Sequence, residues 1–161
     1  MPMRWLLIPL FLCALSLHAG PHWVRMDRGA LQWTFRTSFE LESKPVSGSI
    51  RLFFEKTKGT LQINGAIARR ISAKDAKIEF DVLSYLRRGR NELWIKAYPS
   101  SSSKSSAIAL ELSGMDELGN RFNIQTSPKW KSPSGKVESQ GDLGEEKWWT
   151  LPPLKIDEAD D

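Results

Sequence analysis

The chain has 161 residues, 40% of them hydrophobic, which is enough for one domain with a core of its own. Its formal net charge is +4, and the cations are spread along the sequence rather than gathered in a stripe, which argues against a nucleic-acid-binding protein. Cys13 is the one cysteine, so no disulfide within the chain can form and stability must come from the core.

Residues 1–19 have the pattern of a secretory signal peptide. Arg4 precedes an apolar run from Trp5 to Leu17, and cleavage is expected after Ala19. An uncleaved membrane anchor is the alternative, but the run is shorter than the roughly 20 apolar residues that a spanning helix needs. We therefore expect an exported bacterial protein, secreted or periplasmic, with no membrane span after cleavage.

Residues 20–30 are polar and are expected to form an N-terminal arm. Beyond this arm, apolar and polar residues alternate in short runs, which is typical of half-buried β-strands. The runs cover residues 31–41, 48–55, 61–63, 67–71, 78–82, 91–98, 107–112 and 121–126.

Turn signals separate these runs. Asn64-Gly65 is a strong hairpin signal because both residues tolerate a positive φ, and Gly89 allows a second such turn. The short apolar run from Leu83 to Leu86 suits a single helical turn, and residues 99–106 read as a mobile loop within one domain.

These elements predict an all-β protein, an antiparallel β-sandwich or jelly roll over residues 31–151. Sustained three-four spacing of apolar residues, which a helical protein would need, is missing from the sequence. Residues 152–161 end in an acidic run and are expected to be a C-terminal tail.

Four motifs in order carry a family resemblance. They are Trp33-Thr-Phe-Arg36 with Phe39-Glu-Leu41; Leu61-Gln-Ile-Asn-Gly65; Phe80-Asp-Val82 with Leu86, Gly89, Asn91 and Leu93; and Thr126-Ser-Pro-Lys-Trp130-Lys. Together they resemble the galactose-binding-like jelly-roll domains, in particular the accessory sugar-binding domains of bacterial α-L-rhamnosidases and of family-two glycoside hydrolases. The resemblance implies a sandwich that binds a glycan or polysaccharide, with a secreted glycosidase or another cell-envelope protein as a partner.

The chain departs from this family at two acidic positions. They hold Glu55-Lys-Thr-Lys58 and Thr126-Ser127 here, where relatives often carry carboxylates. Such carboxylates commonly bind calcium in the family. We therefore expect no cofactor, with a structural calcium ion as the alternative.

Aromatic residues give the clearest candidate site. Trp94 and Tyr98 fall on one face of their strand with Lys96 between them, opposite Leu93 and Ile95. Aromatic rings pack against the apolar faces of sugars while polar neighbours orient the hydroxyls, so an outward face would form a carbohydrate-binding platform. The alternative is that a loop or the Trp148-Trp149 segment covers these rings.

Trp148 and Trp149 follow a polar, glycine-rich stretch and precede Pro152-Pro153. This pair of tryptophans could close one end of the sandwich or dock a partner protein. We therefore keep Trp148 and Trp149 as candidate partner-docking residues.

The sequence carries little catalytic chemistry. His18 lies in the expected signal peptide, which leaves His22, on the expected arm, as the one histidine. A catalytic triad needs a buried and oriented imidazole, and a zinc site needs several nitrogen or sulfur ligands. The 19 acidic residues fall in no recognisable glycosidase arrangement. We therefore predict a secreted, non-catalytic carbohydrate-binding module rather than an enzyme. A structural or protein-interaction module on the same scaffold is the first alternative, and a small hydrolase is the second.

Overall fold

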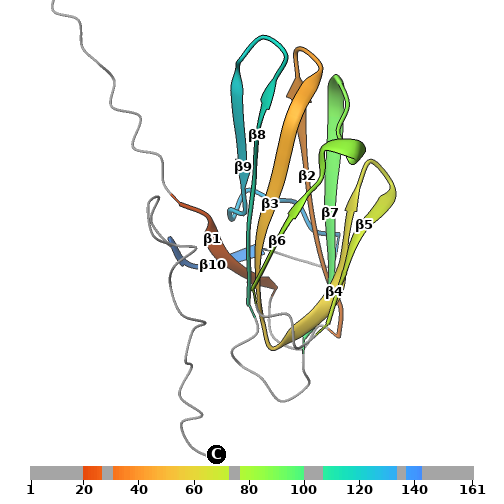
Figure 1. Cartoon of the computed structure of the whole chain (residues 1–161). Helices are drawn as coiled ribbons and strands as arrows, with labels where there is room; N and C mark the ends of the chain where they lie inside the picture. The colour runs from red at the N-terminus through yellow and green to blue at the C-terminus, as the bar shows by residue number, and fades with distance from the viewer. Residues whose placement is uncertain (1–19, 27–30, 73–76, 100–106, 134–136, 143–161) are drawn as a thin grey trace, which may run out of the picture.

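The computed structural model of the chain describes residues 20–26, 31–72, 77–99, 107–133 and 137–142. Within these residues, two antiparallel β-sheets face each other and form a sandwich (Figure 1). The described part contains no α-helix, and its one helical element is the 3₁₀ turn η1 (Leu83–Tyr85), where a single turn was predicted. The predicted all-β antiparallel sandwich is confirmed.

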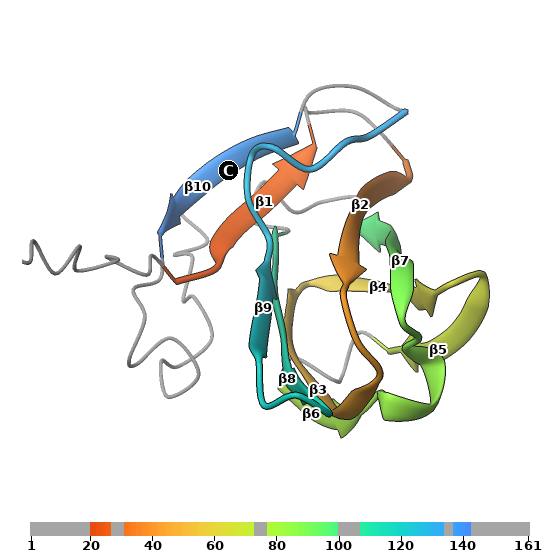
Figure 2. The ribbon, with the colours of Figure 1, turned by 90° about the horizontal axis from the view of Figure 1, so that it is seen from above.

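The first sheet has six strands in the described residues, and β8 lies at its centre. Its path runs β10 (Val137–Asp142), β1 (His22–Met26), β8 (Ala107–Asp116), β3 (Pro45–Glu55) and β6 (Lys77–Asp81), and β9 (Arg121–Gln125) also pairs with β8. The second sheet has four strands, in the order β2 (Trp33–Leu41), β7 (Gly89–Pro99), β4 (Thr57–Ile63) and β5 (Ala66–Ile71). Figure 2 shows the two sheets from above as separate layers.

The core lies between the sheets and consists of the inward half of each alternating run. Phe35 and Ile95 from the four-stranded sheet, and Ile50, Leu52 and Leu110 from the six-stranded sheet, are all fully buried. Burying a large apolar side chain contributes roughly 1.5–3 kcal/mol. The alternation therefore fixes which face of each strand remains available for binding.

The expected N-terminal arm over residues 20–30 needs correcting, because His22–Met26 form β1. This strand pairs along β10 and meets β8 at Val24 and Ile108. Val24 is fully buried in the core. Local patterning could not reveal β1, because its main partner lies more than a hundred residues further along the chain. The sandwich therefore begins at His22 rather than at residue 31.

Three element boundaries also differ from prediction. β3 begins at Pro45, before the predicted run over 48–55, which the first position of a strand allows because no ladder donor is needed there. β4 begins at Thr57, before the predicted run over 61–63 and directly after Lys56, whose φ is 45°. β8 continues through Gly114 to Asp116, beyond the predicted run over 107–112.

Several expectations fall outside the described residues. They are the signal peptide over residues 1–19, the loop predicted over 99–106 except for Pro99, which ends β7, the acidic tail over 152–161, and the candidate docking residues Trp148 and Trp149. Where the chain is described, it contains no helix long and apolar enough to cross a membrane.

Candidate functional site

The three predicted sugar-binding residues project from the outer face of β7. Leu93 and Ile95, which alternate with them, are fully buried on the inner face. Trp94 and Lys96 are half-buried, and Tyr98 is 40% exposed. The structure therefore places the three side chains on one outward face, in the order that the sequence indicated.

Polar side chains border this row on both neighbouring strands. Lys96 lies opposite Thr34 on β2 and Thr60 on β4, and Trp94 lies opposite Gln62. Residues directly opposite each other on one face of a sheet are close enough to act together. The face thus combines two aromatic rings with hydroxyl, amide and ammonium groups, which is the mixture that sugar recognition uses.

One face of the Trp94 ring is occupied by a cation. Arg36 pairs with Trp94 across β2 and β7, and its guanidinium carbon lies 5.0 Å from the ring centroid. A sugar that stacked on that face would have to displace the guanidinium. Trp94 is therefore a covered platform in this conformation, whereas Tyr98 is open.

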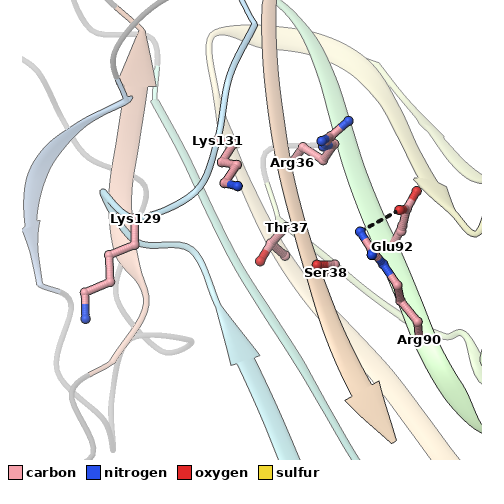
Figure 3. A pocket seen from close by; sticks show the side chains of 7 residues that line it. All are labelled: Arg36, Thr37, Ser38, Arg90, Glu92, Lys129 and Lys131. Atoms are coloured by element: carbon pink, nitrogen blue, oxygen red, sulfur yellow. Dashed lines mark ion pairs between the residues drawn. The ribbon is translucent and has the colours of Figure 1, made fainter.

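A small hollow adjoins Arg36 at the free edge of β2. Its volume is about 200 Å³, and its lining consists of Arg36, Thr37, Ser38, Arg90, Glu92, Lys129 and Lys131 (Figure 3). Four of the lining residues are cations and one is an anion. Glu92 forms an ion pair with Arg90, with 3.2 Å between the Glu92 Oε1 and a terminal nitrogen of Arg90. The hollow therefore carries a net positive charge.

A buried tryptophan brings the two lysines to this hollow. Trp130 belongs to the core, and its indole N–H donates a 2.8 Å hydrogen bond to the Gln125 carbonyl. On its C-terminal side, the backbones of Lys131 and Arg36 exchange two hydrogen bonds of 2.8 and 2.9 Å. Lys129 and Lys131, which flank the buried ring, are both exposed.

A buried asparagine positions Arg90. Asn91 is fully buried, and its Nδ2 donates to the carbonyls of Arg87 and Gly89 at 2.7 and 3.0 Å. Its Oδ1 accepts from the Arg87 N–H at 3.0 Å and from Nδ2 of Asn64 at 2.9 Å. Gly89 has a φ of 85°, as the turn prediction required. The resulting rigid turn presents Arg90 beside Glu92.

A second, wider hollow lies on the outer face of the six-stranded sheet, over β3, β8 and β9. Its volume is about 640 Å³, and Asn123, Gln125 and Arg121 are among its lining residues. The two amides already donate to Oε2 of Glu111, at 3.5 and 3.0 Å. This hollow has no tryptophan or tyrosine in its lining, so we rank it behind the β7 face.

The residues that line the basic hollow were not predicted from the sequence as a site. Arg36, Arg90, Lys129 and Lys131 are far apart in the chain, and only the paired backbones bring them together. One signal was present in the sequence, because Trp130 has a lysine on each side and a buried tryptophan directs its neighbours outward. In the described residues, no group of three or more histidine, cysteine, aspartate or glutamate side chains is placed to hold a metal ion.

Comparison with solved structures identifies the class of fold. A crystal structure of the α-L-rhamnosidase of Streptomyces avermitilis, complexed with L-rhamnose, matches with a TM-score of 0.62 and 18% identity, over 72% of this chain and 12% of that chain. The α-L-rhamnosidase of Aspergillus terreus matches with a TM-score of 0.58 and 13% identity, over 80% of this chain and 19% of that chain. These matches confirm, at the level of the fold, the resemblance drawn from the four motifs.

A lectin shares the same fold. The lectin of Pleurotus ostreatus, solved in complex with GalNAc, matches with a TM-score of 0.62 and 15% identity, over 79% of this chain and 44% of that chain. This chain therefore spans less than half the length of each of these three proteins. No protein-family model and no curated protein matches the sequence.

Proposed function

We propose that this chain is an exported, non-catalytic carbohydrate-binding module that contacts glycans with the outer face of its four-stranded sheet. The observation that carries the proposal is the outward row of Trp94, Lys96 and Tyr98 on β7, bordered by polar side chains from β2 and β4. The shared fold of a lectin that was solved with a bound sugar supports it.

The geometry of the row favours an oligosaccharide over a single sugar. Trp94 and Tyr98 are four residues apart on an extended strand, so their Cα atoms are separated by about 13 Å at ~3.3 Å per residue. A ligand that contacts both rings must be longer than one pyranose. We therefore expect a polysaccharide or a glycan chain to bind better than its monosaccharide.

A binding role also fits the chemistry of the site better than hydrolysis. A glycosidase places two carboxylates across the scissile bond, and the basic hollow contains one carboxylate, Glu92, which is held by Arg90. The expected signal peptide supports export to the periplasm or beyond the cell. A secreted glycosidase or another cell-envelope protein remains the proposed partner, and no cofactor is assigned to the site.

The proposal is tested by isothermal titration of the chain from Gly20 to Asp161 with a panel of plant and bacterial polysaccharides. Trp94→Ala and Tyr98→Ala should each weaken binding about tenfold or more, because each variant loses the apolar area that the ring buries and, in addition, roughly 0.5–1.5 kcal/mol from the aromatic contact. Leu118→Ala is the matched control, since Leu118 is 72% exposed and lies on the turn between β8 and β9. Unchanged affinity in both aromatic variants would contradict the proposal.

A protein-interaction module is the second candidate, because one end of the sandwich exposes apolar side chains. Val46, Met115 and Leu118 lie near the junctions of β3, β8 and β9 and are 47%, 40% and 72% exposed. A partner that used this end would lose affinity with Leu118→Asp and would be indifferent to Trp94→Ala. The two variants therefore separate the two candidates.

A further inference from the structure

We propose that the basic hollow beside β2 binds the carboxylate or sulfate group of an acidic saccharide. This inference rests on the proposed function, and it names the class of glycan that the face would select. The hollow and the Trp94 ring share one residue, Arg36, so an acidic group in the hollow and a sugar on β7 can belong to the same ligand.

The charge of the hollow is the first argument. Arg36, Arg90, Lys129 and Lys131 all line it, and Glu92 neutralises Arg90 through their ion pair. Within the described residues, no carboxylate lies at ion-pair distance from Arg36, Lys129 or Lys131. Like charges gathered in one place repel one another, and a bound anion relieves that repulsion.

The backbone adds donors to these cations. Arg36 exchanges backbone hydrogen bonds with Lys131 on the free side of β2. Because the direction of backbone groups alternates along an antiparallel ladder, the N–H and C=O of Ser38 point to that same free edge. The segment carrying Lys131 and Lys129 turns at Ser127–Trp130, where the Trp130 N–H donates to the Ser127 carbonyl. The N–H of Ser38 can thus donate to an oxyanion, and its carbonyl can accept from a sugar hydroxyl.

The size of the hollow favours one acidic sugar unit over a bulky ligand. Its volume of about 200 Å³ is below the roughly 300–1,000 Å³ of sites that enclose drug-sized molecules. Thr37 and Ser38 line it with hydroxyls, which suit the hydroxyls of a pyranose. A nucleic acid, in contrast, is followed by an extended basic groove with stacking aromatics along it. An acidic saccharide is therefore the ligand that fits the size, charge and hydroxyl content together.

The test compares two ligands that differ only in charge. The chain from Gly20 to Asp161 is titrated with short oligogalacturonides and with the same oligosaccharides after methyl esterification, and a sulfated galactan oligosaccharide separates sulfate from carboxylate as the source of the anion. We expect the acidic form to bind about tenfold or more tightly than the ester, since a charge-assisted hydrogen bond contributes more than a neutral one. The double variant Lys129→Gln/Lys131→Gln should remove that preference, and added NaCl should weaken the acidic form selectively.

Arg121→Gln is the matched control. Arg121 is an exposed cation on β9, in the six-stranded sheet rather than in the sheet that contains β2 and β7, and its loss should change the affinity for neither the acidic nor the esterified oligosaccharide. Because Lys129 and Lys131 are also exposed, the double variant and the control variant should both keep the wild-type melting temperature.

Three results would overturn the inference. The first is equal affinity of the protein for the acidic and the esterified oligosaccharides. If Trp94→Ala then weakened the binding of both oligosaccharides, the proposed function would stand without the acidic preference. The second is complete displacement of the bound oligogalacturonide by an equal concentration of inorganic phosphate or of a single-stranded oligonucleotide. The third is the absence of any binding to either oligosaccharide by the folded protein, which together with a negative panel would remove the proposed function as well.

Discussion

The guanidinium of Arg36 lies over the ring of Trp94, 5.0 Å from its centroid, and lines the basic hollow at the same time. The position of the guanidinium therefore determines whether a ligand can stack on this face of Trp94. In the conformation described, a neutral sugar has open access to Tyr98 but not to the covered face of Trp94. An acidic ligand could draw the guanidinium toward itself and uncover the ring.

Arg36→Ala should expose Trp94. A cation–π contact at a partly exposed site contributes about 0.5–1 kcal/mol, so the free energy of unfolding should fall by about that amount. Stern–Volmer quenching of the tryptophan fluorescence by acrylamide should rise, and it should not rise when the substitution is made in the Trp94→Phe background. Equal quenching before and after the substitution would show that Arg36 does not shield the ring.

Asn91→Ala should destabilise the protein and loosen the turn that presents Arg90. The side chain is fully buried and makes four hydrogen bonds, so its removal leaves buried carbonyl and N–H groups without partners. We expect the free energy of unfolding to fall by about 3 kcal/mol, measured by urea denaturation. Asn123→Ala, which removes one 3.5 Å contact on β9, is the control and should cost less than about 0.5 kcal/mol. A similar loss in both variants would be evidence against this role for Asn91.

Thr126→Val should release β1 from the sheet. The Thr126 hydroxyl donates to the His22 carbonyl at 2.7 Å and accepts from the Leu110 N–H at 3.1 Å, so it ties β1 to β8. Valine keeps the shape and removes both bonds, which should lower the free energy of unfolding by about 2 kcal/mol. Hydrogen exchange at Val24 should accelerate, and Thr126→Ser should restore it. Unaltered exchange in the valine variant would mean that β1 is held by other contacts.

Glu55→Gln should stabilise the protein at neutral pH and remove part of its pH dependence. Burial raises the pKa of the Glu55 carboxyl, and the neighbouring Lys56 partly offsets this. A carboxyl whose pKa is raised by folding favours the folded state below the pKa of the unfolded chain, and that contribution is lost as the pH rises through the folded pKa. Urea denaturation should therefore show the gain from Glu55→Gln growing from pH 4 to pH 8. A gain that is the same across this range would contradict the assignment.

Much of the fold could be predicted because its signals are local. Alternation marked the strand cores, and Asn64-Gly65 marked a hairpin whose two residues have φ values of 52° and 84°. The outward direction of Trp94 and Tyr98 followed from the burial of Leu93 and Ile95. These features need only neighbouring residues, and a period of two is enough to assign the face of each side chain.

What could not be predicted depends on pairing between distant segments. β1 and β10 are short, β10 is mostly polar, and the two strands pair with each other although more than a hundred residues separate them. The basic hollow forms because the backbone of Lys131 pairs with that of Arg36, and the residues around these two positions carry no sequence signal that predicts this pairing. The contact between the Arg36 guanidinium and the Trp94 ring also depends on the register between β2 and β7, which the alternation of the sequence does not determine.

The most direct test of the account is to map a bound glycan onto the two outer faces by amide chemical-shift perturbation. The ligand is the tightest binder from the polysaccharide panel, added as a short oligosaccharide to the ¹⁵N-labelled chain from Gly20 to Asp161. We expect the shifts to concentrate on β2 and β7, at Arg36, Trp94, Lys96 and Tyr98, with the β8–β9 hollow around Asn123 unperturbed. Shifts centred on Asn123 and Gln125, with β7 silent, would contradict this expectation.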